Sequence, residues 1–306
     1  MAEILLSLTI IGVVAAITLP SLTGNINERT WNTQRKALYA RFSQAIALMP
    51  AMNGYGSTAE NAAETFVTAG LSKVLKINNI CDNTHLADCG IPNKVITTDG
   101  RTLNNFTESY NTLLTFNDMF SFEYSITNST GSVVYSDSYS FNDYNAVAFE
   151  TSNGESILAY YNPACQNDMN ASSWHRIQPQ MCANFVYDLN GSKGPNTVGK
   201  DIGFITALYP SDSIVVAPVP LATDAGATVL SAASNKCRKM NSESRMPNKE
   251  ELASIFYNKL LVGINDGNYW SASRISADRI WVLRFHGGYL YAAETSGGFS
   301  LRCIQR

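Results

Sequence analysis

Apolar residues are concentrated at the start of the chain. Between Glu3 and Glu28 there is no charged residue. At about 1.5 Å of rise per residue, a helix from Ile4 to Leu22 is long enough to cross the hydrocarbon core of a bilayer. Glu3 lies at the free end of this run. A carboxylate in apolar surroundings is costly unless it is paired, so we expect Glu3 to have a functional role.

A one-sided pattern follows the apolar run. Its apolar residues recur at helical spacing with charged residues between them, as in an amphipathic helix. Together the two stretches predict one helix of about 48 residues, roughly 70 Å long, which Pro50 and Gly54 end. Between Gly12 and Pro20 it could bend or unwind, because proline removes a backbone hydrogen bond. The predicted apolar stripe of the second half, which we expect to pack on a sheet, is Trp31, Leu38, Phe42, Ala45 and Met49.

The middle of the chain is predicted to be rich in strands. After a shorter helix over Ala59–Leu75, four segments between residues 106 and 161 alternate with turn sequences, which indicates an antiparallel meander. A fifth strand is predicted at residues 185–189. The long helix packed on this sheet would form an α+β head. The four segments are FSFEYSIT, SVVYSDSYSF, AVAFE and SILAYY.

Prolines at positions 210, 218 and 220 indicate a crossing into a C-terminal unit. Two helices are predicted there, over residues 224–237 and 245–260. The second has Pro247 in its first turn and Glu250 and Glu251 near its positive end. Strands follow at GNYWSAS, RIWVLRF, YLYAAE and FSLRCIQR. The predicted domains are an N-terminal helix (1–52), an antiparallel β head (53–211) and a small α+β domain (212–306).

Charge is unevenly distributed along the chain. The net charge is −3, and only 15% of residues are charged. Residues 236–306 carry 11 Lys or Arg against 6 Asp or Glu, so the rest of the chain has a net charge of −8. This asymmetry favours a separate C-terminal unit. No run of basic residues interleaves with aromatic ones, so a solvated face is preferred over a nucleic-acid site.

Six cysteines in well-separated pairs are typical of an exported, oxidised protein. Proximity in the sequence favours the pairs Cys81–Cys89 and Cys165–Cys182, which leaves Cys237–Cys303. Zinc binding is the alternative. The chain has no Cys-x-x-Cys sequence, and its three histidines are scattered, so zinc is disfavoured.

No catalytic motif was found, and we expect neither an enzyme nor an organic cofactor. Gly-x-Ser-x-Gly, a phosphate-binding glycine loop and His-Glu-x-x-His are all absent. Asp188, Asn190 and Asp201 flank two turn sequences, and their oxygens could ligate a hard cation such as calcium. The alternative is a turn in which these side chains cap their own backbone.

The sequence AEILLSLTIIGVVAAITLPSL (2–22) resembles the N-terminal helix of type IV pilins and pseudopilins. Glu3 matches the family's glutamate, Gly12 its mid-helix glycine and Pro20 its helix proline. The resemblance implies that Glu3 pairs with the N-terminal amine, at Met1, of a neighbouring subunit. It also implies that Gly12–Pro20 is melted in a filament. Some pseudopilin heads carry a calcium loop near the end of the sheet.

One feature departs from the pilin pattern. Glu3 comes two positions earlier than in a mature pilin, so either two mature residues precede Met1 or the chain starts at Met1. A cleaved signal peptide and an ordinary single-pass anchor are the alternative interpretations. The lack of a basic start disfavours the first, and a simple anchor has no use for Glu3.

The C-terminal unit resembles a second family. RMPNKEEL, GNYWSAS, RIWVLRF and SLRCIQR are similar to motifs in C-terminal modules of bacterial surface proteins with a C-type-lectin-like fold. The resemblance covers about residues 212–306. It implies a disulfide from the module's first helix to its last strand, which Cys237–Cys303 would supply. The Glu-Pro-Asn motif of sugar-binding lectins is absent, so carbohydrate binding is not implied.

These resemblances imply a structural subunit of a type IV pilus or related filament. It would reside in the inner membrane before assembly by the pilus machinery, and then form an extracellular homo-oligomer through its N-terminal helices. One alternative is a minor or tip pilin, or a membrane-anchored surface protein, whose lectin-like module binds an unidentified surface ligand. The other is a pseudopilin of a type II secretion system.

Overall fold

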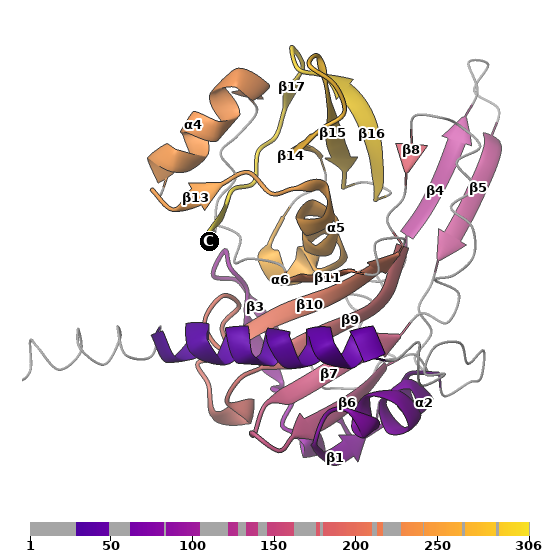
Figure 1. Ribbon diagram of the computed structural model, residues 1–306, viewed down its shortest axis with the longest axis vertical. Helices are drawn as coiled ribbons and strands as arrows, with labels where there is room; N and C mark the ends of the chain where they lie inside the picture. The colour runs from indigo at the N-terminus through magenta and orange to yellow at the C-terminus, as the bar shows by residue number, and fades with distance from the viewer. Residues whose placement is uncertain are drawn as a thin grey trace, which may run out of the picture.

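The structure is a computed structural model of the α+β class with antiparallel sheets (Figure 1). Among the predicted site residues, Met1, Glu3, Gly12, Pro20 and Cys165 lie outside the residues that it describes. Within the described part, no helix is both long and apolar enough to cross a membrane. The described residues are 29–48, 62–82, 84–104, 122–127, 133–139, 146–161, 176–177, 180–209, 213–216, 228–240, 242–264, 267–285 and 288–305.

A six-stranded antiparallel sheet forms the centre of the molecule, with strand order β1-β6-β7-β9-β10-β11. β7 is buried along its whole length, because both faces of the sheet are covered. Successive side chains of a strand point to opposite faces, so each strand supplies two separate cores. The six strands are β1 (Ile77–Cys81), β6 (Ala146–Thr151), β7 (Ser156–Tyr161), β9 (Gln180–Asp188), β10 (Ile202–Tyr209) and β11 (Ser213–Val216).

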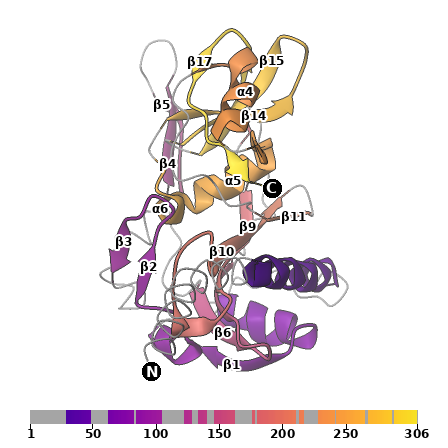
Figure 2. The same cartoon turned by 90° about the vertical axis from the view of Figure 1, so that its left-hand side faces the viewer.

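Residues 29–48 form a helix that crosses one face of this sheet (Figures 1 and 2). The predicted stripe is confirmed at Leu38, Phe42 and Ala45, which are buried. Trp31 is partly buried, and Met49 lies outside the described residues. The rings of Phe42 and Phe185 of β9 meet edge to face with centroids 4.8 Å apart, a favourable aromatic geometry.

A second helical segment covers the same face. The predicted helix Ala59–Leu75 is found in part, as three short turns of different type that precede β1. They are α2 (Ala62–Thr65), a π-helical turn (Phe66–Gly70) and a 3₁₀ turn (Leu71–Lys73).

The predicted four-strand meander is wrong in its pairing. β4 (Phe122–Thr127) and β5 (Val133–Tyr139) form a two-stranded sheet of their own. β6 pairs instead with β1 on one side and β7 on the other, so both of its edges are occupied. β1 has the sequence Ile-Asn-Asn-Ile-Cys, which lacks the alternation that marks a strand.

The other face of the central sheet is covered by a hairpin and two helices. The hairpin consists of β2 (Lys94–Ile96) and β3 (Thr102–Asn104), and the helices are α5 (Lys249–Tyr257) and α6 (Lys259–Val262). Figure 2 shows the hairpin and the helix 29–48 on opposite sides of the sheet.

The C-terminal unit places α4 (Leu230–Met240) and α5 on opposite faces of the sheet β14-β15-β16-β8. The predicted first helix begins at Leu230, six positions after residue 224, and a short strand precedes it.

Asn248 is the N-cap of α5 and forms a capping box with Glu251. Pro247 therefore lies before the cap, not in the first turn as predicted. The remaining strands are β8 (Arg176–Ile177), β12 (Thr228–Val229), β13 (Ser244–Arg245), β14 (Asn268–Arg274), β15 (Arg279–Arg284), β16 (Tyr289–Glu294), β17 (Gly298–Phe299) and β18 (Ile304–Gln305).

The head and the C-terminal unit share secondary structure and core. β11 pairs with β10 of the head, although it follows the expected boundary at 211/212. β8 precedes that boundary and pairs with β16 of the C-terminal unit. One apolar cluster joins Phe204 of the central sheet to Phe256 of α5 and Phe285 after β15. The two parts are thus packed into one continuous body.

Candidate cation site in the β9–β10 loop

Two buried carboxylates lie at the ends of the loop that joins β9 to β10. Asp188 is the last residue of β9, and Asp201 immediately precedes β10; their exposed fractions are 2% and 0%. Ile202 pairs with Asp188 across the two strands, so the ladder brings the carboxylates to the same end of the sheet. The loop can turn back because Gly191, Gly194 and Asn196 adopt positive φ angles.

Asp201 organises the far half of the loop. Its two carboxylate oxygens accept hydrogen bonds from the backbone N–H groups of Asn196 and Thr197, each at 2.8 Å. This is the backbone-capping role that the alternative interpretation of the sequence predicted for these residues. It accounts for Asp201 without any bound ion.

Asp188 is less well satisfied. Its Oδ1 accepts a hydrogen bond from the backbone N–H of Asn190 at 3.1 Å. Burial raises the pKa of Asp188 to about 7, and the negative charge of Asp201 acts in the same direction. At neutral pH a positive charge at this site, either a proton or a cation, would therefore stabilise the folded state.

Three buried side-chain oxygens in this loop accept no hydrogen bond from any described residue: Asp188 Oδ2, Asn190 Oδ1 and Asn196 Oδ1. The amide nitrogen of Asn190 donates to Gly194 O at 2.8 Å, which fixes the Asn190 side chain to the loop. Buried polar atoms are nearly always paired, so these three oxygens are candidate positions for a bound water or cation. Carboxylate and amide oxygens are the donor types that calcium prefers, so the chemistry of these side chains is compatible with that ion.

Asn196 was missed by sequence reasoning, which named only Asp188, Asn190 and Asp201. The turn sequence Gly194-Pro195-Asn196 was the signal, because asparagine tolerates the left-handed conformation that such a turn requires. The described residues contain no group of three or more His, Cys, Asp or Glu side chains placed to hold a metal. A cation here would depend on the carboxylate of Asp188 together with the amide oxygens of Asn190 and Asn196.

The loop is anchored to two other parts of the molecule. Arg35, in the helix 29–48, donates from Nη2 to Gly199 O at 3.0 Å. On the other side, the N–H of Ile96 in β2 donates to Asn196 O, and the N–H of Val198 donates to Ile96 O, each at 2.8 Å. The site therefore touches both the helix and the β2–β3 hairpin.

Two predicted disulfides are present. Cys81–Cys89 closes a short loop at the end of β1, and Cys237–Cys303 joins α4 to the last residues of the C-terminal unit. Cys182 is also disulfide-bonded, while its predicted partner Cys165 lies outside the described residues.

No model of a protein family matches the chain, and no curated protein matches it significantly.

Proposed function

We propose that this chain is a structural subunit of a type IV pilus or a related filament. The observation that carries the proposal is the helix 29–48. One face of it is packed on an antiparallel sheet, and an uncharged run with a pilin-like pattern precedes it in the sequence.

The helix is fixed to the head mainly through its second half. Its fully buried side chains begin at Leu38, whereas residues 29, 30 and 32–34 are exposed. Arg41 donates to the buried carboxylate of Glu155 beside β7, which sets the helix position on the sheet. In Figure 1 the N-terminal end of this helix lies beyond the sheet.

The apolar run Ile4–Leu22 precedes this end of the helix in the sequence. Such a run needs an apolar environment, either a bilayer or the equivalent helices of other subunits. A pilus-type subunit uses both in turn: the inner membrane before assembly, and then the shared core of an extracellular filament. Glu3 would pair with the N-terminal amine of a neighbouring subunit as the helices come together.

The C-terminal unit would lie on the filament surface. Its resemblance to C-type-lectin-like modules supports a role for this unit in contacts with the cell's surroundings. A minor or tip pilin and a type II secretion pseudopilin remain the alternatives, and they differ in whether the chain forms long filaments by itself.

Substitution of Glu3 tests the proposal. Glu3→Ala should reduce the filament fraction sheared from cells by at least about tenfold. Loss of only about 1.4 kcal/mol of assembly free energy is enough to lower the yield by this factor. Glu28→Ala, at the other end of the uncharged run, is the matched control and should leave the yield near wild type. Circular dichroism of both variants in detergent checks that the head is folded. Wild-type filament yield from Glu3→Ala would contradict the proposal.

A second function is supported by the orphaned oxygens of the β9–β10 loop: binding of a hard divalent cation. Saturation with a ligand at a hundred times its Kd stabilises the folded state by about 2.7 kcal/mol. Calcium chloride should therefore raise the melting temperature of the full-length chain in detergent. Asp188→Asn should abolish that rise, whereas Asp278→Asn, an exposed control, should preserve it. An equal calcium response in both variants would exclude the site.

A further inference from the structure

A continuous hydrogen-bonded path leads out of the β9–β10 loop. Asp201 holds the backbone N–H groups of Asn196 and Thr197. Thr197 forms a parallel bridge with Ile96 of β2, whose N–H donates to Asn196 O. Ile96 also pairs with Thr102 of β3. Any rearrangement of the loop around a cation must therefore act on the β2–β3 hairpin.

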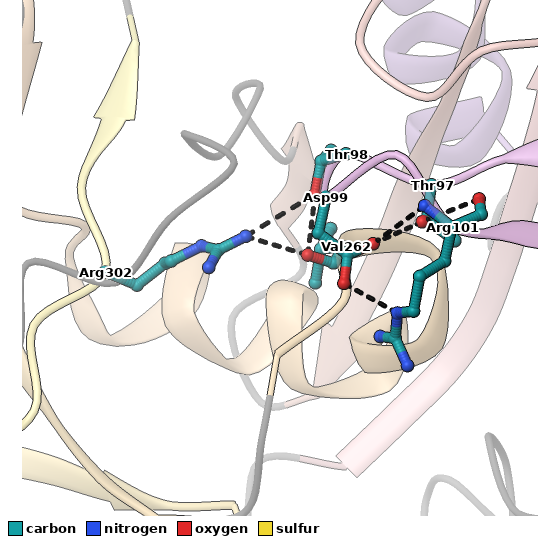
Figure 3. A network of polar contacts seen from close by, with 6 residues as sticks. All are labelled: Thr97, Thr98, Asp99, Arg101, Val262 and Arg302. Carbon is teal, nitrogen blue, oxygen red and sulfur yellow. Dashed lines mark hydrogen bonds and ion pairs between the residues drawn. The ribbon is translucent and has the colours of Figure 1, made fainter.

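The tip of this hairpin docks on the C-terminal unit at the end of α6. The N–H of Thr98 donates to Leu261 O at 3.2 Å, and its hydroxyl donates to Val262 O at 2.6 Å. Arg302 completes the contact, with its Nη2 2.7 Å from Val262 O and 3.4 Å from the Thr98 hydroxyl oxygen (Figure 3). One hydroxyl thus joins the hairpin, α6 and the last segment of the chain.

The contact is tightly packed and leaves little freedom. Asp99 lies against Gly263, where an added Cβ would come within 2.3 Å of the carboxylate carbon. Asp99 is held in place by Thr97 and by Arg101, whose Nε lies 2.6 Å from the carboxylate. Arg302 is 2% exposed and adjoins Cys303, which is bonded to Cys237 of α4. A displacement of the hairpin would therefore also disturb the packing of the C-terminal unit.

We propose that the β2–β3 hairpin couples cation binding in the β9–β10 loop to the order of the C-terminal unit. The inference rests on the proposed cation site. Occupation of the loop fixes Asn196 and Thr197, which in turn hold β2 and the tip of the hairpin against α6. Coupling of this kind is reciprocal, so a firmly docked C-terminal unit also favours cation binding.

Hydrogen exchange followed by mass spectrometry tests the coupling on the full-length chain in detergent, with and without calcium chloride. Calcium should slow exchange in peptides covering 189–201. It should also slow exchange about tenfold in peptides covering 95–99 and 257–264, within the usual range of coupling between sites. Thr98→Val removes the connecting hydroxyl at nearly constant shape and should confine the slowing to the loop and β2. Thr68→Val, at an exposed threonine, should respond like wild type.

The outcomes separate the two proposals. Slowing confined to 189–201 in wild type would overturn the coupling and leave the cation site standing. An undiminished response of 257–264 in Thr98→Val would also overturn the coupling. If calcium slows exchange in no peptide, the cation site itself is refuted, and the coupling with it.

Discussion

A buried polar cluster holds the central sheet against α5. Asn184 of β9, Thr206 of β10, and Ser254 and Asn258 at α5 are all fully buried. The two asparagines exchange hydrogen bonds of 2.9 and 3.1 Å, and the Thr206 hydroxyl donates to Asn184 Oδ1 at 2.7 Å. Asn258 also donates to Ser254 O at 2.9 Å. The cluster is polar, inaccessible to water and internally paired.

Asn258→Ala would remove three of these hydrogen bonds and leave the Asn184 amide buried without its partner. A typical intramolecular hydrogen bond contributes about 1 kcal/mol net to stability, so the three lost bonds account for about 3 kcal/mol. We therefore expect a loss of about 3 kcal/mol in the free energy of unfolding. Asn153→Ala, at an exposed turn position, is the control and should cost less than about 0.5 kcal/mol.

Urea unfolding of the full-length chain in nonionic detergent measures this difference. Tryptophan fluorescence and far-UV circular dichroism should report coincident transitions, because α5 and the sheet share one apolar cluster. The midpoint should fall with an unchanged slope. A loss below about 1 kcal/mol would show that water reaches the cluster, and separate transitions would show that the two parts unfold independently.

Three further predictions concern a buried carboxylate, an ion pair and a disulfide. Between about pH 4 and pH 7 the folded state keeps a proton on Asp188 that the unfolded state has lost, because the pKa of Asp188 is raised in the folded state. The free energy of unfolding, measured in EDTA, should therefore fall as the pH rises through this window, by at most about 1.4 kcal/mol per pH unit. Asp188→Asn should flatten that pH dependence in urea titrations, and an unchanged slope would contradict the assignment. Arg41→Ala should lower the free energy of unfolding, measured by thermal melting, by about 2 kcal/mol. This is less than for a fully buried ion pair, because Arg41 is partly exposed. No measurable loss would refute the role of the contact with Glu155. Replacing Cys237 and Cys303 by serine should cost about 2–5 kcal/mol in the same assay, and wild-type stability would show that the bridge is dispensable.

Much of the fold is predictable because its signals are local. The helix 29–48 has an apolar stripe with a 3.6-residue period, and β6, β7 and β9 are apolar runs bounded by turn sequences. β1 is not predictable in this way, since two adjacent asparagines interrupt its pattern. It becomes a strand through pairing with β6, which is a tertiary effect.

The candidate cation site shows the same limit. Asp188, Asn190 and Asp201 stand out because they surround turn sequences. Asn196 is marked in the sequence only as a turn residue, and the structure adds that its side-chain oxygen is buried without a described partner. The docking of Thr98 on Val262 and Arg302 joins residues far apart in sequence and leaves no local pattern. Predictions that depend on long-range pairing therefore need the folded structure.

A cryo-EM map of filaments formed by the full-length chain is the most direct test of the proposed function. The proposal predicts a helical polymer of one repeating subunit, with the Ile4–Leu22 segments in its core and Glu3 beside a neighbouring N-terminal amine. It also predicts that helical density is interrupted between Gly12 and Pro20. Unbroken helical density from Ile4 to Met49 would contradict that interruption. A polymer built from head contacts alone, or only separate subunits in lipid, would contradict the filament role itself.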